Sequence, residues 1–119
     1  MASSVPAPQA VFVTEWTDLF VVVIAGDFEN RSELDLLDMA LESGRVAGKH
    51  IVVDVSRVEC MNAEVLGALL RHRSGTGRLP WLVGPLSLST KRRLEVTGTL
   101  TRFRVLPTLL EATAQSRAE

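Results

Sequence analysis

The apolar run from Ile51 to Val55 constrains the fold of this chain more than any other segment. Its sequence is Ile-Val-Val-Asp-Val, so hydrophobic β-formers occupy nearly every position instead of alternating with polar residues. A strand of this kind is buried on both faces, which requires helices packed on an at least partly parallel sheet. The run therefore predicts an α/β domain.

Shorter β-forming segments surround this central strand. Residues 11–13 and 19–24 are separated by a polar turn, which predicts a hairpin. Further strands are expected at 81–83 and 103–106. The expected architecture is a small mixed sheet of four to five strands packed with about four α-helices.

The helices are predicted from apolar spacing and from residues that begin or end helices. Ser32-Glu33-Leu34-Asp35 has capping-box spacing and leads into an apolar face that includes Leu37 and Leu41. Asn62 is predicted to cap a second helix, which Ser74-Gly75-Thr76-Gly77 is expected to end. A third is expected over 87–97, with Leu88 and Leu94 on its inner face and Gly98 as its stop. Pro107 is expected in the first turn of a fourth.

The composition excludes several classes of protein. The chain has 119 residues and a net charge of −1, and its pI of about 6.1 lies well below the value above about 9 that is typical of basic nucleic-acid binders. Cys60 is the only cysteine, which excludes an intrachain disulfide and zinc sites of the paired-cysteine type. The longest apolar run, Leu19 to Ala25, is far shorter than the roughly 20 residues of a membrane helix. Because Met1 to Pro8 has no basic residue ahead of an apolar stretch, we expect no signal peptide. The pI and the short apolar runs lead us to expect no direct contact with nucleic acid or membrane. Together these features predict a cytoplasmic protein.

Three stretches together carry a resemblance to a known family. Residues 51–58 are an apolar strand followed by a turn and a valine, residues 61–69 open a helix, and residues 93–100 end a helix with Thr-Gly. In this order and spacing they resemble the STAS domain, the fold of bacterial anti-sigma-factor antagonists. The resemblance implies one STAS-like domain over about 11–115, between tails at 1–10 and 116–119.

The chain departs from the family at its phosphorylation motif, Asp-Ser-Ser-Gly-Leu. Asn62 stands in place of the Asp, Ala63 in place of the phosphoacceptor Ser, Glu64 in place of the second Ser and Val65 in place of the Gly. In the family, a kinase-type anti-sigma factor phosphorylates the first Ser and thereby blocks binding. Since Ala63 has no hydroxyl, we expect no phosphorylation at this position.

The resemblance implies a regulatory binding protein that is not an enzyme and needs no cofactor or metal. It would sequester a kinase-type anti-sigma factor and so regulate sigma-factor-dependent transcription. The residues expected to bind this partner are at the helix start and on a neighbouring loop: Asn62, Ala63, Glu64, Val65, Gly67, Asp27, Glu29 and Asn30.

The charge distribution fits a basic partner. Residues 1–42 carry a net charge of −7 and residues 43–119 a net charge of +6. In the STAS arrangement the loop after Gly26 lies beside the second helix, so Asp27, Glu29 and Glu64 are expected to form one acidic patch.

Two alternatives remain open for the altered motif. Glu64 could mimic a permanently phosphorylated, non-binding state, or it could only complement the positive end of the helix that Asn62 caps.

The chain could also be a STAS scaffold, or a module that senses a nucleotide or lipid. A homodimer is open as well.

Other polar residues favour structural interpretations. Cys60 is expected to be buried and structural, instead of a redox sensor, and Trp81 to pack in or beside the core. Asp54 is expected to orient the turn after its strand. His50, His72 and the triplet Lys91-Arg92-Arg93 are expected on the surface.

Overall fold

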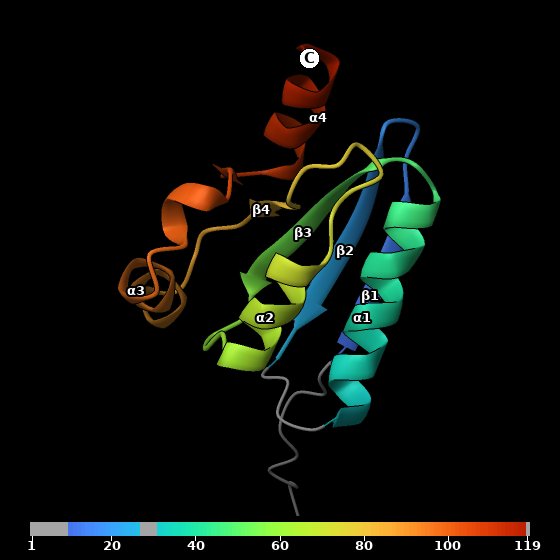
Figure 1. The fold of residues 1–119 in the computed structure, drawn as a ribbon. Helices are drawn as coiled ribbons and strands as arrows, with labels where there is room; N and C mark the ends of the chain where they lie inside the picture. Colours follow the sequence, from blue (N-terminus) through green and yellow to red (C-terminus); the bar gives the residue numbers. More distant parts are fainter. Residues whose placement is uncertain (1–9, 27–30, 119) are drawn as a thin grey trace, which may run out of the picture.

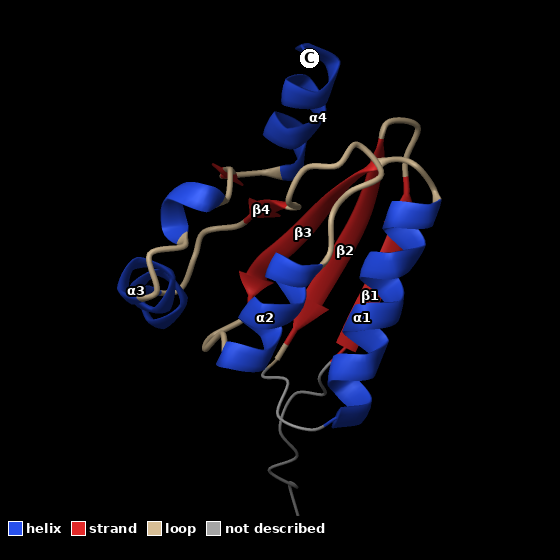
Figure 2. Ribbon diagram, viewed as in Figure 1, coloured by secondary structure: helices blue, strands red, loops and turns tan. Residues whose placement is uncertain are grey.

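The computed structural model of the chain describes residues 10–26 and 31–118 and contains one mixed, five-stranded sheet (Figures 1 and 2). The first two strands form an antiparallel hairpin, and the remaining three add in parallel in chain order. Both the α/β class and the hairpin are therefore confirmed. The strands are β1 (Ala10–Glu15), β2 (Leu19–Ala25), β3 (His50–Arg57), β4 (Trp81–Val83) and β5 (Val105–Leu106).

Within the described residues, four α-helices and one short 3-10 turn connect and flank these strands. Figure 1 shows α1 and α2 side by side over one face of the sheet, while α4 lies beyond the end where β3 and β4 begin. None of the helices in the described ranges is long and apolar enough to cross a membrane. The elements are α1 (Arg31–Val46), α2 (Ala63–Arg71), α3 (Leu88–Val96), η1 (Leu100–Arg102) and α4 (Leu109–Ala118).

The central strand β3 is buried on both faces, as predicted. Ile51, Val52, Val53 and Val55 have no exposed surface. Ile51, Val53 and Val55 join the core under α1 and α2. Val52 faces the other side of the sheet, in a smaller cluster with Ala112 of α4. Burial of both faces fixes the strand's register, because a slip of one residue would exchange the two sets.

The helix boundaries confirm some predicted signals and correct others. Gly98 follows α3 with a φ of +70°, a conformation that favours glycine and ends the helix. The capping-box prediction at Ser32 is wrong, because α1 already includes Arg31. The prediction that Pro107 opens α4 is also wrong: the hydroxyl of Thr108 accepts a hydrogen bond from the Glu111 backbone N–H at 3.1 Å, which makes Thr108 the cap and leaves Pro107 outside the helix.

Candidate functional site

The start of α2 lies at the edge of the sheet where the parallel strands β3 and β4 end. Asn62 has an extended backbone, and its side-chain Oδ1 accepts a hydrogen bond from the Val65 backbone N–H at 2.9 Å. This confirms the predicted cap. Glu64 lies in the first turn, where its negative charge complements the positive end of the helix dipole.

The predicted partner-binding residues of α2 differ in their accessibility. Ala63 and Glu64 are exposed, and Asn62 and Gly67 are half-buried. Val65 is only 3% exposed and belongs to the core between α2 and the sheet. The surface that this helix start offers therefore centres on Ala63 and Glu64.

The other predicted binding residues, Asp27, Glu29 and Asn30, lie outside the described residues. Of the predicted acidic patch, only Glu64 is described.

Two serines attach the loop before α2 to the start of α3. The Ser87 hydroxyl donates to the Glu59 carbonyl oxygen at 2.6 Å, and the Ser89 hydroxyl donates to Cys60 Sγ at 3.3 Å. Ser87 also caps α3, because its Oγ accepts from the Thr90 backbone N–H at 3.0 Å. These bonds hold the starts of α2 and α3 close together as one surface at this edge.

Comparison with solved structures places this arrangement among known folds. No model of a protein family and no curated protein matches the chain. A crystal structure of an anti-sigma factor antagonist from Mycobacterium paratuberculosis superposes with a TM-score of 0.76 at 22% identity, over 97% of this chain and 99% of that one. The chain has the STAS fold.

Two further solved structures share this STAS fold. The anti-sigma factor antagonist SpoIIAA in its unphosphorylated form gives a TM-score of 0.68 at 18% identity, covering 92% of this chain and all of its own. The NMR structure of the protein TM1081 gives a TM-score of 0.70 at 20% identity, with 100% of both chains covered. The predicted fold is thus confirmed along nearly the whole chain.

The prediction that Cys60 is buried is wrong, since its side chain is exposed on the loop between β3 and α2. The next residue, Met61, takes the inward position and has no exposed surface. The apolar side chain that this loop contributes to the core is therefore one residue later than expected. Cys60 instead lies on the surface shared by the starts of α2 and α3, beside Ser89.

The two histidines are also less exposed than predicted. His50 is 6% exposed, with its ring centroid 3.9 Å from that of Trp81 and its Nδ1 3.1 Å from the Thr76 hydroxyl. Trp81 is buried, as expected. His72 is half-buried, and its Nε2 lies 2.9 Å from Asp38 Oδ1, which links the end of α2 to α1.

The prediction that Asp54 orients the turn after its strand is wrong, because β3 continues past it to Arg57. Asp54 Oδ1 accepts hydrogen bonds from the backbone N–H of Ser56 at 2.9 Å and from the Ser56 hydroxyl at 2.6 Å. Both bonds stay within the last residues of β3, so the carboxylate acts on the end of its own strand.

The structure adds one surface residue that the sequence pattern misassigned. Leu88 was expected on the inner face of α3 with Leu94, but Leu88 is 75% exposed and only Leu94 is buried. Leu88 lies between the two serines that bind the loop before α2, so it adds an apolar side chain to this edge. Lys91 and Arg92 are exposed, as predicted, whereas Arg93 is half-buried. The described residues include no group of three or more His, Cys, Asp or Glu side chains able to hold a metal ion.

Proposed function

We propose that this chain is a regulatory binding protein that sequesters an anti-sigma factor of kinase-type fold in the cytoplasm, and that it acts without phosphorylation at position 63. The observation that carries the proposal is the exposed, capped start of α2 with Ala63 at its first position. The STAS fold supports it, since two solved structures of that fold are anti-sigma factor antagonists.

The proposed contact surface is centred on Ala63 and Glu64 and extends to the start of α3. Leu88 supplies an exposed apolar side chain there, and Cys60 lies between the two helix starts. Interfaces depend on a few apolar or aromatic anchors surrounded by polar groups, and the exposed Leu88 between Ser87 and Ser89 fits that description. The proposed surface also includes Asn62, Gly67 and the loop residues Asp27, Glu29 and Asn30.

The mechanism is competitive. The antagonist covers the anti-sigma factor, which releases a sigma factor for transcription. A phosphate on the helix start would add a charge of about −1.5 to −2 and weaken such a contact. Ala63 has no side-chain hydroxyl to carry a phosphate, so control does not run through position 63.

A binding assay with two matched variants tests this proposal. The wild-type protein is mixed at micromolar concentration with each kinase-type anti-sigma factor of its host, beside the variants Ala63→Arg and Ala114→Arg. Both substitutions place the same bulky cation at an exposed helical position, but Ala114 is on α4, at the other end of the sheet. We expect Ala63→Arg to weaken binding by at least about 30-fold, the loss typical of a contact at the centre of an interface, and Ala114→Arg to bind as the wild type does. Absence of any pairing, or equal binding by both variants, would contradict the proposal.

A further inference from the structure

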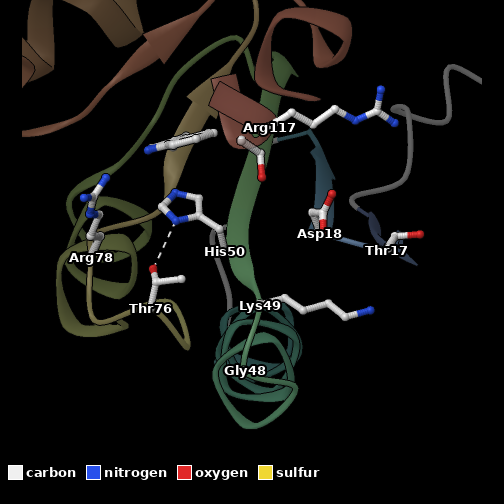
Figure 3. A pocket seen from close by; sticks show the side chains of 10 residues that line it. Thr17, Asp18, Gly48, Lys49, His50, Thr76, Arg78 and Arg117 are labelled. Atoms are coloured by element: carbon white, nitrogen blue, oxygen red, sulfur yellow. Dashed lines mark hydrogen bonds between the residues drawn. The ribbon is translucent and has the colours of Figure 1, made fainter. Parts of the chain in front are cut away.

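A second surface feature lies at the opposite end of the sheet from the start of α2. It is an open cavity of about 740 Å³ at the amino ends of β3 and β4. Its walls come from the β1–β2 turn, the start of β3, the loop before β4 and the last turn of α4 (Figure 3). None of these segments belongs to the surface proposed for the anti-sigma factor.

The cavity is lined mainly by cationic and hydroxyl-bearing side chains. Lys49, Arg78 and Arg117 line it together with a single carboxylate, Asp18. This local excess of positive charge contrasts with the net charge of −1 of the whole chain. Figure 3 shows Arg78 and Arg117 on either side of His50. Arginine side chains suit phosphate because their planar guanidinium groups donate two parallel hydrogen bonds.

The floor of the cavity is held in place by hydrogen bonds. The Lys49 ammonium donates to the Trp16 carbonyl oxygen at 2.7 Å and pairs with Glu15 Oε2 at 2.8 Å, which fixes it at the β1–β2 side. On the other side, the buried ring of His50 lies 3.1 Å from the Thr76 hydroxyl through its Nδ1. The Gly75 backbone N–H donates to the Lys49 carbonyl oxygen at 3.0 Å and joins the two loops. A cavity with such a fixed floor is preorganised, which lowers the entropic cost of binding.

The fourth wall, α4, is attached to the domain by few apolar contacts. Ala112 is its only fully buried residue in the described range, and Leu110 is 80% exposed. Arg117 lies in the last turn of this helix. Figure 3 shows the two guanidinium groups on opposite sides of His50; once both turn toward His50, an anion bound by Arg117 and Arg78 connects α4 to the loop before β4 and stabilises the helix against the sheet.

We infer that this cavity binds a small, soluble phosphate-bearing molecule, with Arg78 and Arg117 as its main contacts to the phosphate oxygens. Lys49, whose ammonium pairs with Glu15, lies at one side, and the Thr76 hydroxyl is near the floor. Because α4 forms one wall, occupancy stabilises the folded domain as well as the helix.

Calorimetric titration and thermal denaturation with inorganic pyrophosphate at constant ionic strength test this inference. The test variant is Arg78→Gln combined with Arg117→Gln. The control is Lys91→Gln combined with Arg92→Gln, which removes two exposed positive charges from α3 instead. We expect wild type and control to bind, with Tm raised by about 5 °C or more at pyrophosphate concentrations tenfold above Kd. The test variant should bind at least about tenfold more weakly.

Three results would overturn the inference: no binding by the wild type, unchanged binding by the test variant, or an equal loss in the control, which would indicate general electrostatics. The anti-sigma factor assay is independent of these results. The test variant leaves the start of α2 intact, so loss of pyrophosphate binding with normal partner binding separates the two sites.

Discussion

Gly75 packs directly against Gly48. A Cβ atom at Gly75 would lie 2.3 Å from the Cα of Gly48 and 2.8 Å from the Lys49 nitrogen. The added Cβ would clash with backbone atoms, which cannot move away by changing rotamer as a side chain can. The contact joins the loop before β4 to the turn before β3 and forms one corner of the phosphate-binding cavity proposed above.

We therefore expect Gly75→Ala to lower the free energy of unfolding by about 1–3 kcal/mol, the usual cost of overpacking. Gly67→Ala is the matched control. Gly67 is inside α2, and its new Cβ would meet only the flexible end of Arg71 at 3.2 Å. That variant should gain about 0.5–1 kcal/mol, because alanine favours the helix. Urea denaturation measures both, and a Gly75→Ala protein as stable as the wild type would refute the close contact.

The cap of α2 makes a second prediction. Asn62→Ala removes the acceptor of the Val65 N–H and should lower the free energy of unfolding by about 1 kcal/mol. Asn62→Asp keeps a capping oxygen and adds a negative charge at the helix start, so its stability should stay within a few tenths of a kcal/mol of the wild type. Equal losses in the two variants, measured by thermal or urea denaturation, would argue against the capping role.

Exposure of Cys60 predicts rapid alkylation of the folded protein. Iodoacetamide should add one group per chain without denaturant, and Cys60→Ser should take none. Intact-mass measurement over time gives the rate. If anti-sigma factor binding uses the surface shared by α2 and α3, the alkylated protein should also bind its partner less well. Labelling that requires denaturant would show that the thiol is buried.

The altered motif predicts the outcome of a phosphorylation assay. With a kinase-type partner and ATP, the wild-type protein should incorporate no phosphate at position 63, while Ala63→Ser combined with Glu64→Ser should gain an acceptor there. Ser74 is not an alternative acceptor in the folded chain, since its buried hydroxyl accepts from the Ile51 N–H at 2.8 Å. Phosphopeptide mapping of the wild type to the exposed Ser56 would instead show that the acceptor has moved to the end of β3.

The surface pair Glu42–Arg45 predicts a local pH effect. Arg45 Nε donates to Glu42 Oε1 at 3.0 Å, and this hydrogen bond holds the pKa of the Glu42 carboxyl below its ordinary value of 4.5. A carboxyl whose pKa is lower in the folded state stabilises the fold above its unfolded pKa, and that contribution is lost as the pH falls through the folded pKa. We expect Arg45→Gln to raise the pKa of Glu42 in an NMR titration, and 1 M salt to reduce the difference between the two proteins. Identical titration curves at low salt would contradict the ion pair.

Local sequence signals predicted the sheet and most helices of this chain. The run Ile51 to Val55 identified a doubly buried strand, and Asn62 and Gly98 marked helix ends, because each signal depends on residues close in sequence. The errors at Ser32 and Pro107 were shifts of one or two residues along correctly predicted helices. Such boundaries are decided by which cap finds a partner, which spacing alone does not determine.

The candidate sites were predicted less completely, because their geometry depends on contacts between distant segments. Cys60 was placed in the core and Leu88 on an inner face, yet both are exposed where α2 meets α3. Ser74-Gly75-Thr76-Gly77 was predicted only to end a helix. In the folded chain this loop packs on Gly48 and contributes to a cavity.

The sequence by itself determined the α/β class, the order of the elements and the absence of a hydroxyl at position 63. These follow from local apolar periodicity and from residue identity. Only the tertiary structure decided that Met61 is buried in place of Cys60, that His50 lies against Trp81, and that three cations from separate segments line one cavity. Packing decides which side chains are buried and which lie together, because these contacts join segments that are distant in sequence and meet only once the sheet has formed.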